Sequence, residues 1–151
     1  MSYDFRIPVE AAYLSALGRA TYNFTYLEWG IVWIAERLRP GYANTVRGKT
    51  AGDIAKDFER LSKQPTDSGL KARLTSLASN FQALVERRNG LIHANPMTAD
   101  GGAQRLRDPG KPGKRDVFEW AETDILELAH KFELAAIDAN EIFHKALPQQ
   151  K

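Results

Sequence analysis

Residues 13–38 read YLSALGRATYNFTYLEWGIVWIAERL, and this stretch decides the fold class. Its apolar side chains recur every three or four residues, which is the repeat of one face of an α-helix. The positions on this face are Tyr13, Leu17, Ala20, Phe24, Leu27, Ile31, Ile34 and Leu38. We expect the helix to begin near Pro8 and to end before Pro40, because the residue that precedes a proline is pushed out of α geometry.

A second apolar stripe runs along another side of the same helix. It consists of Tyr22, Tyr26, Trp29 and Trp33, and an offset of two residues turns an α-helix by about 200°. One apolar side can face the helix's own domain, and the other needs a further layer or a partner subunit. Three interpretations remain open for these aromatic residues: burial in the core, a dimer interface, and stacking on nucleic-acid bases.

Three further helices are expected. A short helix capped near Thr50 ends before Pro65, and a third helix starts in the capping cluster at residues 66–68. The last helix runs from about Thr123 to Ala146. The second helix places Ile54, Phe58 and Leu61 on one face, the third places Leu70, Leu74, Leu77, Phe81 and Leu84, and the last places Ile125, Ala129, Phe132, Ala136, Ala139 and Phe143.

The segment from Asn95 to Arg115 differs from the rest of the chain, because it contains three prolines and four glycines. We expect two short strands, Gln104–Arg107 and Asp116–Trp120, joined by a turn-rich loop. The prediction is therefore a single all-α domain over residues 1–151, an antiparallel bundle of four main helices with a small β-hairpin before the last helix.

Composition excludes several classes of protein. The chain has 151 residues and no cysteine, so disulfides, thiolate catalysis and cysteine zinc sites are ruled out. No run of about 18 apolar residues occurs and the N-terminal residues are polar, so we expect a cytoplasmic protein with neither a membrane span nor a signal peptide. The net charge of +2 permits a polyanionic partner without pointing to one.

An arginine interrupts the apolar face of the third helix. Four residues beyond Leu84 the pattern reaches Arg88, and three further on it reaches Leu91. A guanidinium cannot lose its charge, and burying it unpaired is costly. Either an anion meets Arg88 or the side chain lies at an open groove. An internal anion of this kind would be the carboxylate of Glu86, Glu119, Glu122 or Asp124.

Two further polar residues accompany Arg88. Asn89 lies four residues before His93 and so on nearly the same helix face. His93 stands at the helix end, where its imidazole can cap the terminal carbonyls or swing toward Arg88. Arginine, amide and imidazole can therefore converge on one place.

The string ERRNGLIH, residues 86–93, resembles the signature of HEPN domains, which is an arginine, a polar residue directly after it, and a histidine after four to six intervening residues. Arg88, Asn89 and His93 fit with four intervening residues, and Arg87 fits with five, so both registers remain open. The motif lies near the end of an internal helix, before a proline-containing loop and a long final helix, as it does in that family.

The resemblance implies an endoribonuclease that needs no metal and no cofactor, including toxins that have antitoxin partners and antiviral effectors. Two protomers would pair as a homodimer whose motifs line a shared cleft, and the RNA's own 2′-OH would attack the phosphate. Arg88 would hold the phosphate oxygens, Asn89 would orient the imidazole or the phosphate, and the His93 imidazole would move a proton.

Basic residues before the last helix suit contacts with an RNA backbone, and an ordinary solvated loop explains them equally well. The candidates are Arg87, Arg105, Arg107, Lys111, Lys114 and Arg115. Two other functions remain open: a non-catalytic dimeric interaction module that pairs through Trp29 and Trp33, and a nucleotide or small-ligand binder that uses Arg88.

Overall fold

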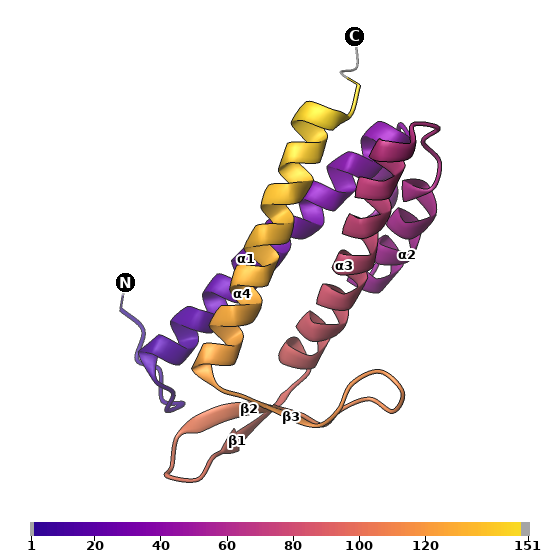
Figure 1. Ribbon diagram of the computed structural model, residues 1–151. Helices are drawn as coiled ribbons and strands as arrows, with labels where there is room; N and C mark the ends of the chain where they lie inside the picture. Colours follow the sequence, from indigo (N-terminus) through magenta and orange to yellow (C-terminus); the bar gives the residue numbers. More distant parts are fainter. Residues whose placement is uncertain (1, 149–151) are drawn as a thin grey trace.

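The computed structural model describes residues 2–148, and this part of the chain is predominantly α-helical, as predicted (Figure 1). Four α-helices and a small sheet follow one another along the chain. The helices are α1 (Ala11–Leu38), α2 (Ala51–Ser62), α3 (Ser68–Ile92) and α4 (Glu122–Glu141), with short turns η1 (Tyr42–Thr45) and η2 (Ile142–Ala146).

The helix ends lie close to the capping signals in the sequence. Thr50 caps α2 in a capping box, in which the Thr50 hydroxyl accepts from the Asp53 N–H and the Asp53 carboxylate accepts from the Thr50 N–H. Asp67 caps α3 in the same position. The last helix continues to Ala146 as predicted, but its final turn is a π-helix.

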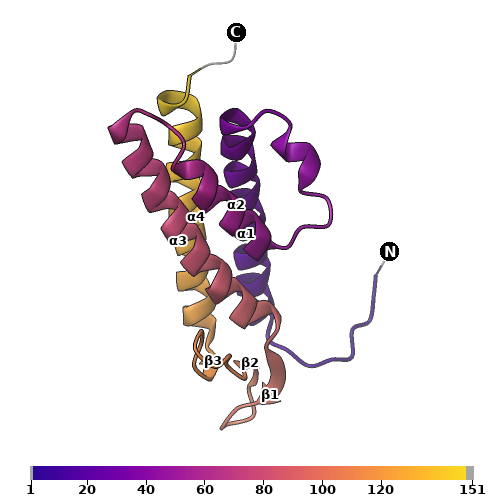
Figure 2. The same cartoon turned by 90° about the vertical axis from the view of Figure 1, so that its right-hand side faces the viewer.

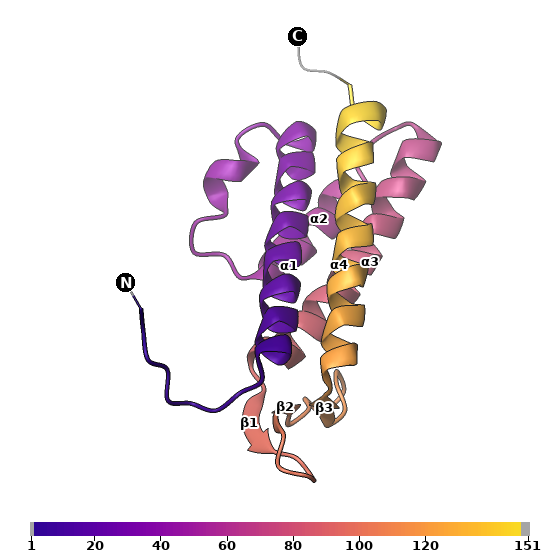
Figure 3. The same ribbon diagram turned by 90° about the vertical axis from the view of Figure 1, so that its left-hand side faces the viewer.

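The core lies between two pairs of helices. α1 lies beside α4 along most of its length (Figure 3), and α2 crosses α3 on the other side of the domain (Figure 2). The predicted apolar face of α1 is buried, except that Leu17 and Leu38 are partly exposed. Phe24 packs against Phe81 of α3 and Phe132 of α4, so aromatic contacts join three of the helices.

A three-stranded antiparallel sheet lies at one end of the helices, with strands β1 (Asn95–Thr98), β2 (Gln104–Asp108) and β3 (Phe118–Trp120) in the order β1-β2-β3. The predicted hairpin corresponds to β2 and β3. The sequence does not predict β1, because Pro96 cannot donate a hydrogen bond to a strand ladder and proline is rare inside strands. β1 is an edge strand, and an edge strand tolerates a proline because half of its backbone groups have no ladder partner.

Side chains attach this sheet to the helices. The Tyr13 hydroxyl of α1 donates to the Trp120 carbonyl at 2.8 Å and accepts from the Leu106 N–H at 3.0 Å. The buried Trp120 indole donates to the Gly90 carbonyl of α3 at 3.2 Å. The sheet therefore fixes the end of α3 that carries the Arg88 motif. No helix among residues 2–148 is long and apolar enough to cross a membrane.

Candidate functional site

Arg88 lies half-buried near the end of α3, where it faces α1. Its Nη1 donates to Asn89 Oδ1 at 3.0 Å, and its guanidinium carbon lies 5.0 Å from the centre of the Phe24 ring. The amide and the ring hold the guanidinium from two sides. The Asn89 side chain therefore orients Arg88, whereas the HEPN resemblance implies that Asn89 orients the imidazole or the phosphate.

The charge of Arg88 acts on a carboxylate of α1, that of Glu28. Burial raises the pKa of Glu28, and the charge of Arg88 acts in the opposite direction. Two of the predicted internal partners of Arg88 are wrong, because they bind other groups. Glu86 binds Arg115 and Lys114, and the Asp124 carboxylate accepts a hydrogen bond from the Ala121 N–H at the start of α4. Neither Glu119 nor Glu122 forms an ion pair with Arg88 in the described part of the chain.

His93 is the residue that follows α3, and its side chain is exposed. Its N–H donates to the Asn89 carbonyl at 3.1 Å, which closes the helix. Across residues 2–148, no hydrogen bond joins its imidazole to Arg88 or to the Asn89 side chain. The structure thus brings the Arg88 and Asn89 side chains together and leaves the His93 imidazole exposed to solvent.

Arg87, the alternative motif arginine, points elsewhere. Its guanidinium carbon lies 4.9 Å from the ring centre of Phe118 and 4.6 Å from that of Trp120. These cation–π contacts bind Arg87 to β3. Arg88 remains the arginine beside Asn89, so the geometry favours the register with four intervening residues.

Arg115 is part of the fold. Its Nε donates to Asp108 Oδ2 at 2.8 Å, its Nη1 donates to Glu86 at 3.1 Å, and the side chains of Arg115 and Asp108 are only 15% and 3% exposed. Burial alone would raise the pKa of Asp108, but the hydrogen bonds from Arg115 and the Gly110 N–H outweigh it and lower that pKa. Arg115 therefore has a structural role, and its contact with RNA stays a prediction.

The remaining basic candidates differ in their surroundings. Arg105 pairs with Glu10 at 3.3 Å and lies over the Tyr13 ring, and Lys114 reaches Glu86 at 3.4 Å. Arg107 and Lys111 are exposed. The three exposed side chains at residues 107, 111 and 114 keep the capacity to contact a phosphate backbone.

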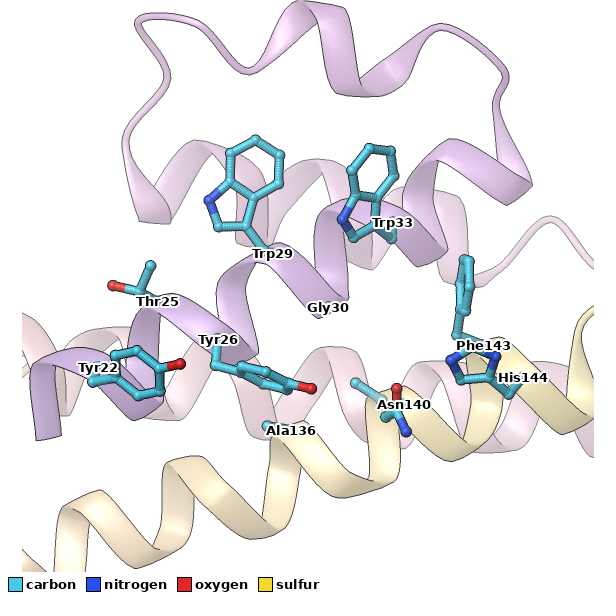
Figure 4. A pocket seen from close by; sticks show the side chains of 11 residues that line it. Tyr22, Thr25, Tyr26, Trp29, Gly30, Trp33, Ala136, Asn140, Phe143 and His144 are labelled. Atoms are coloured by element: carbon cyan, nitrogen blue, oxygen red, sulfur yellow. The ribbon is translucent and has the colours of Figure 1, made fainter. Parts of the chain in front are cut away.

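The second aromatic stripe of α1 lies on the surface. Tyr22, Tyr26, Trp29 and Trp33 are 69%, 58%, 44% and 47% exposed, so their interpretation as core residues is wrong. They line a groove of about 630 Å³ between α1 and α4 (Figure 4). The far wall comes from Asn140 of α4 and from Phe143 and His144 of η2. The sequence did not identify this wall. Hydrophobic periodicity shows which residues share one face of a helix, but it does not show which other segment lies across a groove from that face.

Comparison with known proteins adds no assignment. The chain matches no family model, no curated protein and no solved structure. The resemblance to HEPN domains rests on the residues of the motif and on their place at the end of α3.

Proposed function

We propose that this protein is a metal-independent endoribonuclease of the HEPN type, with its four helices arranged as an antiparallel bundle. The observation that carries the proposal is Arg88, a half-buried guanidinium held by Asn89 and Phe24. Across residues 2–148 it has no direct ion pair with a carboxylate, so its charge is available to an anion. The exposed His93 imidazole follows it by five residues and supplies a group that exchanges protons.

The chemistry follows from these groups. A scissile RNA phosphate bound at Arg88 accepts two parallel hydrogen bonds from the guanidinium, which stabilise the charge of the transition state. The 2′-oxygen forms a bond to phosphorus while the bond from phosphorus to the 5′-oxygen breaks, which leaves a 2′,3′-cyclic phosphate and a 5′-hydroxyl. One His93 imidazole takes the 2′-OH proton, and that of a second protomer protonates the leaving oxygen.

The partners in this proposal are RNA and a second copy of the chain. Arg107, Lys111 and Lys114 contribute backbone contacts of little sequence preference. A ribonuclease of this kind acts as a toxin or an antiviral effector, and an antitoxin protein that covers the motif would restrain it.

The test is cleavage of single-stranded RNA in the presence of EDTA, with the ends of the products identified. We expect cyclic phosphate ends from the wild type and none from His93→Ala. His130→Ala is the matched control, because His130 is also exposed but lies on α4, where its imidazole is 3.4 Å from the Glu133 carboxylate. Circular dichroism should be unchanged in both variants. Equal cleavage by His93→Ala and wild type contradicts the proposal.

A second function is favoured by the exposed aromatic stripe. A helical interaction module without catalysis needs such a surface and does not need a functional Arg88. In that case neither the wild type nor any variant cuts RNA, and Arg88→Ala changes only stability. The same assay therefore separates the two functions.

A further inference from the structure

The outer face of the sheet carries a hollow of about 360 Å³ at the end where β1 follows α3 (Figure 1). It is lined by side chains of β1 and β2 and of the residues that adjoin β2 and β3, namely Asn95, Met97, Arg107, Pro109 and Val117. Successive side chains of a strand point to opposite faces of a sheet, and the buried Asp108 and Trp120 belong to the face that packs on the helices. The hollow therefore lies on the opposite face, which is turned toward solvent.

Asn95 and Arg107 supply the polar groups of the hollow. They are register partners in the β1–β2 pair, so their side chains lie next to each other on one face. Both are exposed, and within residues 2–148 neither side chain forms a hydrogen bond or an ion pair, although Glu119 is the register partner of Arg107 in β3. An amide and a guanidinium that keep their hydrogen-bonding capacity are thus placed side by side.

The other three side chains make the rest of the hollow apolar. Met97 is partly buried, Pro109 is exposed, and Val117 is 56% exposed. Apolar walls with a few polar groups, in a volume of about 300–1,000 Å³, are the usual form of a site for a small molecule. The base of a nucleotide suits such walls, because it presents a flat ring face and a polar edge.

We infer that this hollow binds an unpaired guanine base of a single-stranded RNA, with its ring against the apolar walls and its polar edge at Arg107 and Asn95. The inference rests on the proposed function, because it takes the RNA to cross the end of α3. His93 lies two residues before Asn95, so their Cα atoms are at most about 7 Å apart. A base in the hollow therefore belongs to a nucleotide at the cleavage site or next to it.

Guanine is the base that fits a guanidinium best. Its O6 and N7 are two adjacent acceptors, and a guanidinium presents parallel donors and no acceptor. Adenine places an amino group beside N7, and this donor meets the donors of Arg107 unfavourably. The same edge of a pyrimidine offers at most one acceptor. Because a guanidinium has five donors, contact of Arg107 with the base leaves others for the RNA backbone.

Binding of labelled RNA hexanucleotides tests the site, measured by fluorescence anisotropy with His93→Ala protein so that no strand is cut. One strand contains only uracil, and three others carry a single guanine, adenine or cytosine near the centre. We expect the guanine strand to bind about tenfold tighter than the others, which is the discrimination that a bidentate contact with a base provides. Equal affinity for the four strands, or no binding of any of them, overturns the inference.

Arg107→Lys separates recognition of the base from charge, because lysine keeps the charge but cannot form the bidentate contact. In the His93→Ala background this variant should lose the preference for guanine and keep its affinity for the uracil strand. Arg47→Lys is the matched control, since Arg47 is also exposed but lies between η1 and α2, and it should keep the preference. A preference that survives Arg107→Lys refutes the site.

A competition experiment distinguishes an RNA strand from a free nucleotide. Guanosine monophosphate should displace the guanine strand only at a much higher concentration, because it lacks the neighbouring phosphates that basic residues bind. Displacement at equal concentration refutes RNA as the ligand of the hollow. A guanine preference in a protein that cuts no RNA contradicts only the proposed function, and cleavage without any base preference contradicts only this inference.

Discussion

Gly90→Ala tests how closely the sheet is fitted to α3. A Cβ at Gly90 would overlap the Asp108 carboxylate and would lie 3.1 Å from Arg115 Nε and 3.2 Å from Arg115 Cδ. The carboxylate cannot move without losing its hydrogen bond to Arg115 and the one it accepts from the Gly110 N–H. The added methyl group of Gly90→Ala would therefore push the Asp108 carboxylate away from the Arg115 guanidinium.

The magnitude follows from three contributions. Overpacking costs about 1–3 kcal/mol, and a lost hydrogen bond to a buried charged group costs about 1.5–3 kcal/mol. The better helix propensity of alanine offsets about 1 kcal/mol of this. We expect the free energy of unfolding of Gly90→Ala to fall by about 1.5–5 kcal/mol in urea titrations followed by circular dichroism at 222 nm.

Gly18→Ala is the matched control, because the same substitution meets no atom within 4 Å there. It should leave the stability of the protomer unchanged or raise it by up to about 1 kcal/mol. In an Asp108→Ala background the cost of Gly90→Ala should shrink, since the overlapping carboxylate is gone. If Gly90→Ala is as stable as the wild type, the close fit described for Asp108 and Gly90 is wrong.

Three further outcomes follow from the fold. Tyr13→Phe should lower the free energy of unfolding by about 2 kcal/mol in urea titrations, because it leaves the Trp120 carbonyl and the Leu106 N–H without their partner; an unchanged midpoint contradicts this. Thr50→Ala should cost about 1 kcal/mol by loss of the α2 cap, and Thr50→Ser should restore it. The lowered pKa of Asp108 stabilises the fold above the ordinary carboxyl pKa, and this stabilisation is lost as the pH falls from about 4 through the folded-state value. In urea titrations at a series of acidic pH values, the free energy of unfolding of Asp108→Asn should therefore fall less steeply with pH than that of the wild type. Equal slopes for the two proteins contradict the lowered pKa of Asp108.

Much of the fold could be predicted because its signals are local. The Thr50 cap, the proline that follows α1 and the apolar repeat each depend on a few consecutive residues. The edge strand β1 was not predicted, because Pro96 is usually a sign of irregular chain and only the pairing with β2 makes the segment a strand. Local patterns therefore place the helices but not the edge of the sheet.

The surroundings of the site depended on contacts between distant segments. The motif Arg88–Asn89 could be identified from its spacing, but the influence of Glu28 could not, because α1 and α3 meet only in the folded domain. Arg115 looked like a free basic residue since neither Asp108 nor Glu86 is adjacent to it in the chain. Periodicity also could not tell that the second aromatic stripe is uncovered.

The long contact between α1 and α4 joins the two ends of the sequence, and this governs when the domain can fold during its synthesis. α2 and α3 are neighbours in the chain and can pair as soon as both have left the ribosome. The apolar face of α1 must wait until α4 has been made, a delay on the order of ten seconds at ordinary translation rates. During that interval a nascent chain exposes both apolar sides of α1, so we expect it to be a substrate for chaperones that bind apolar helices.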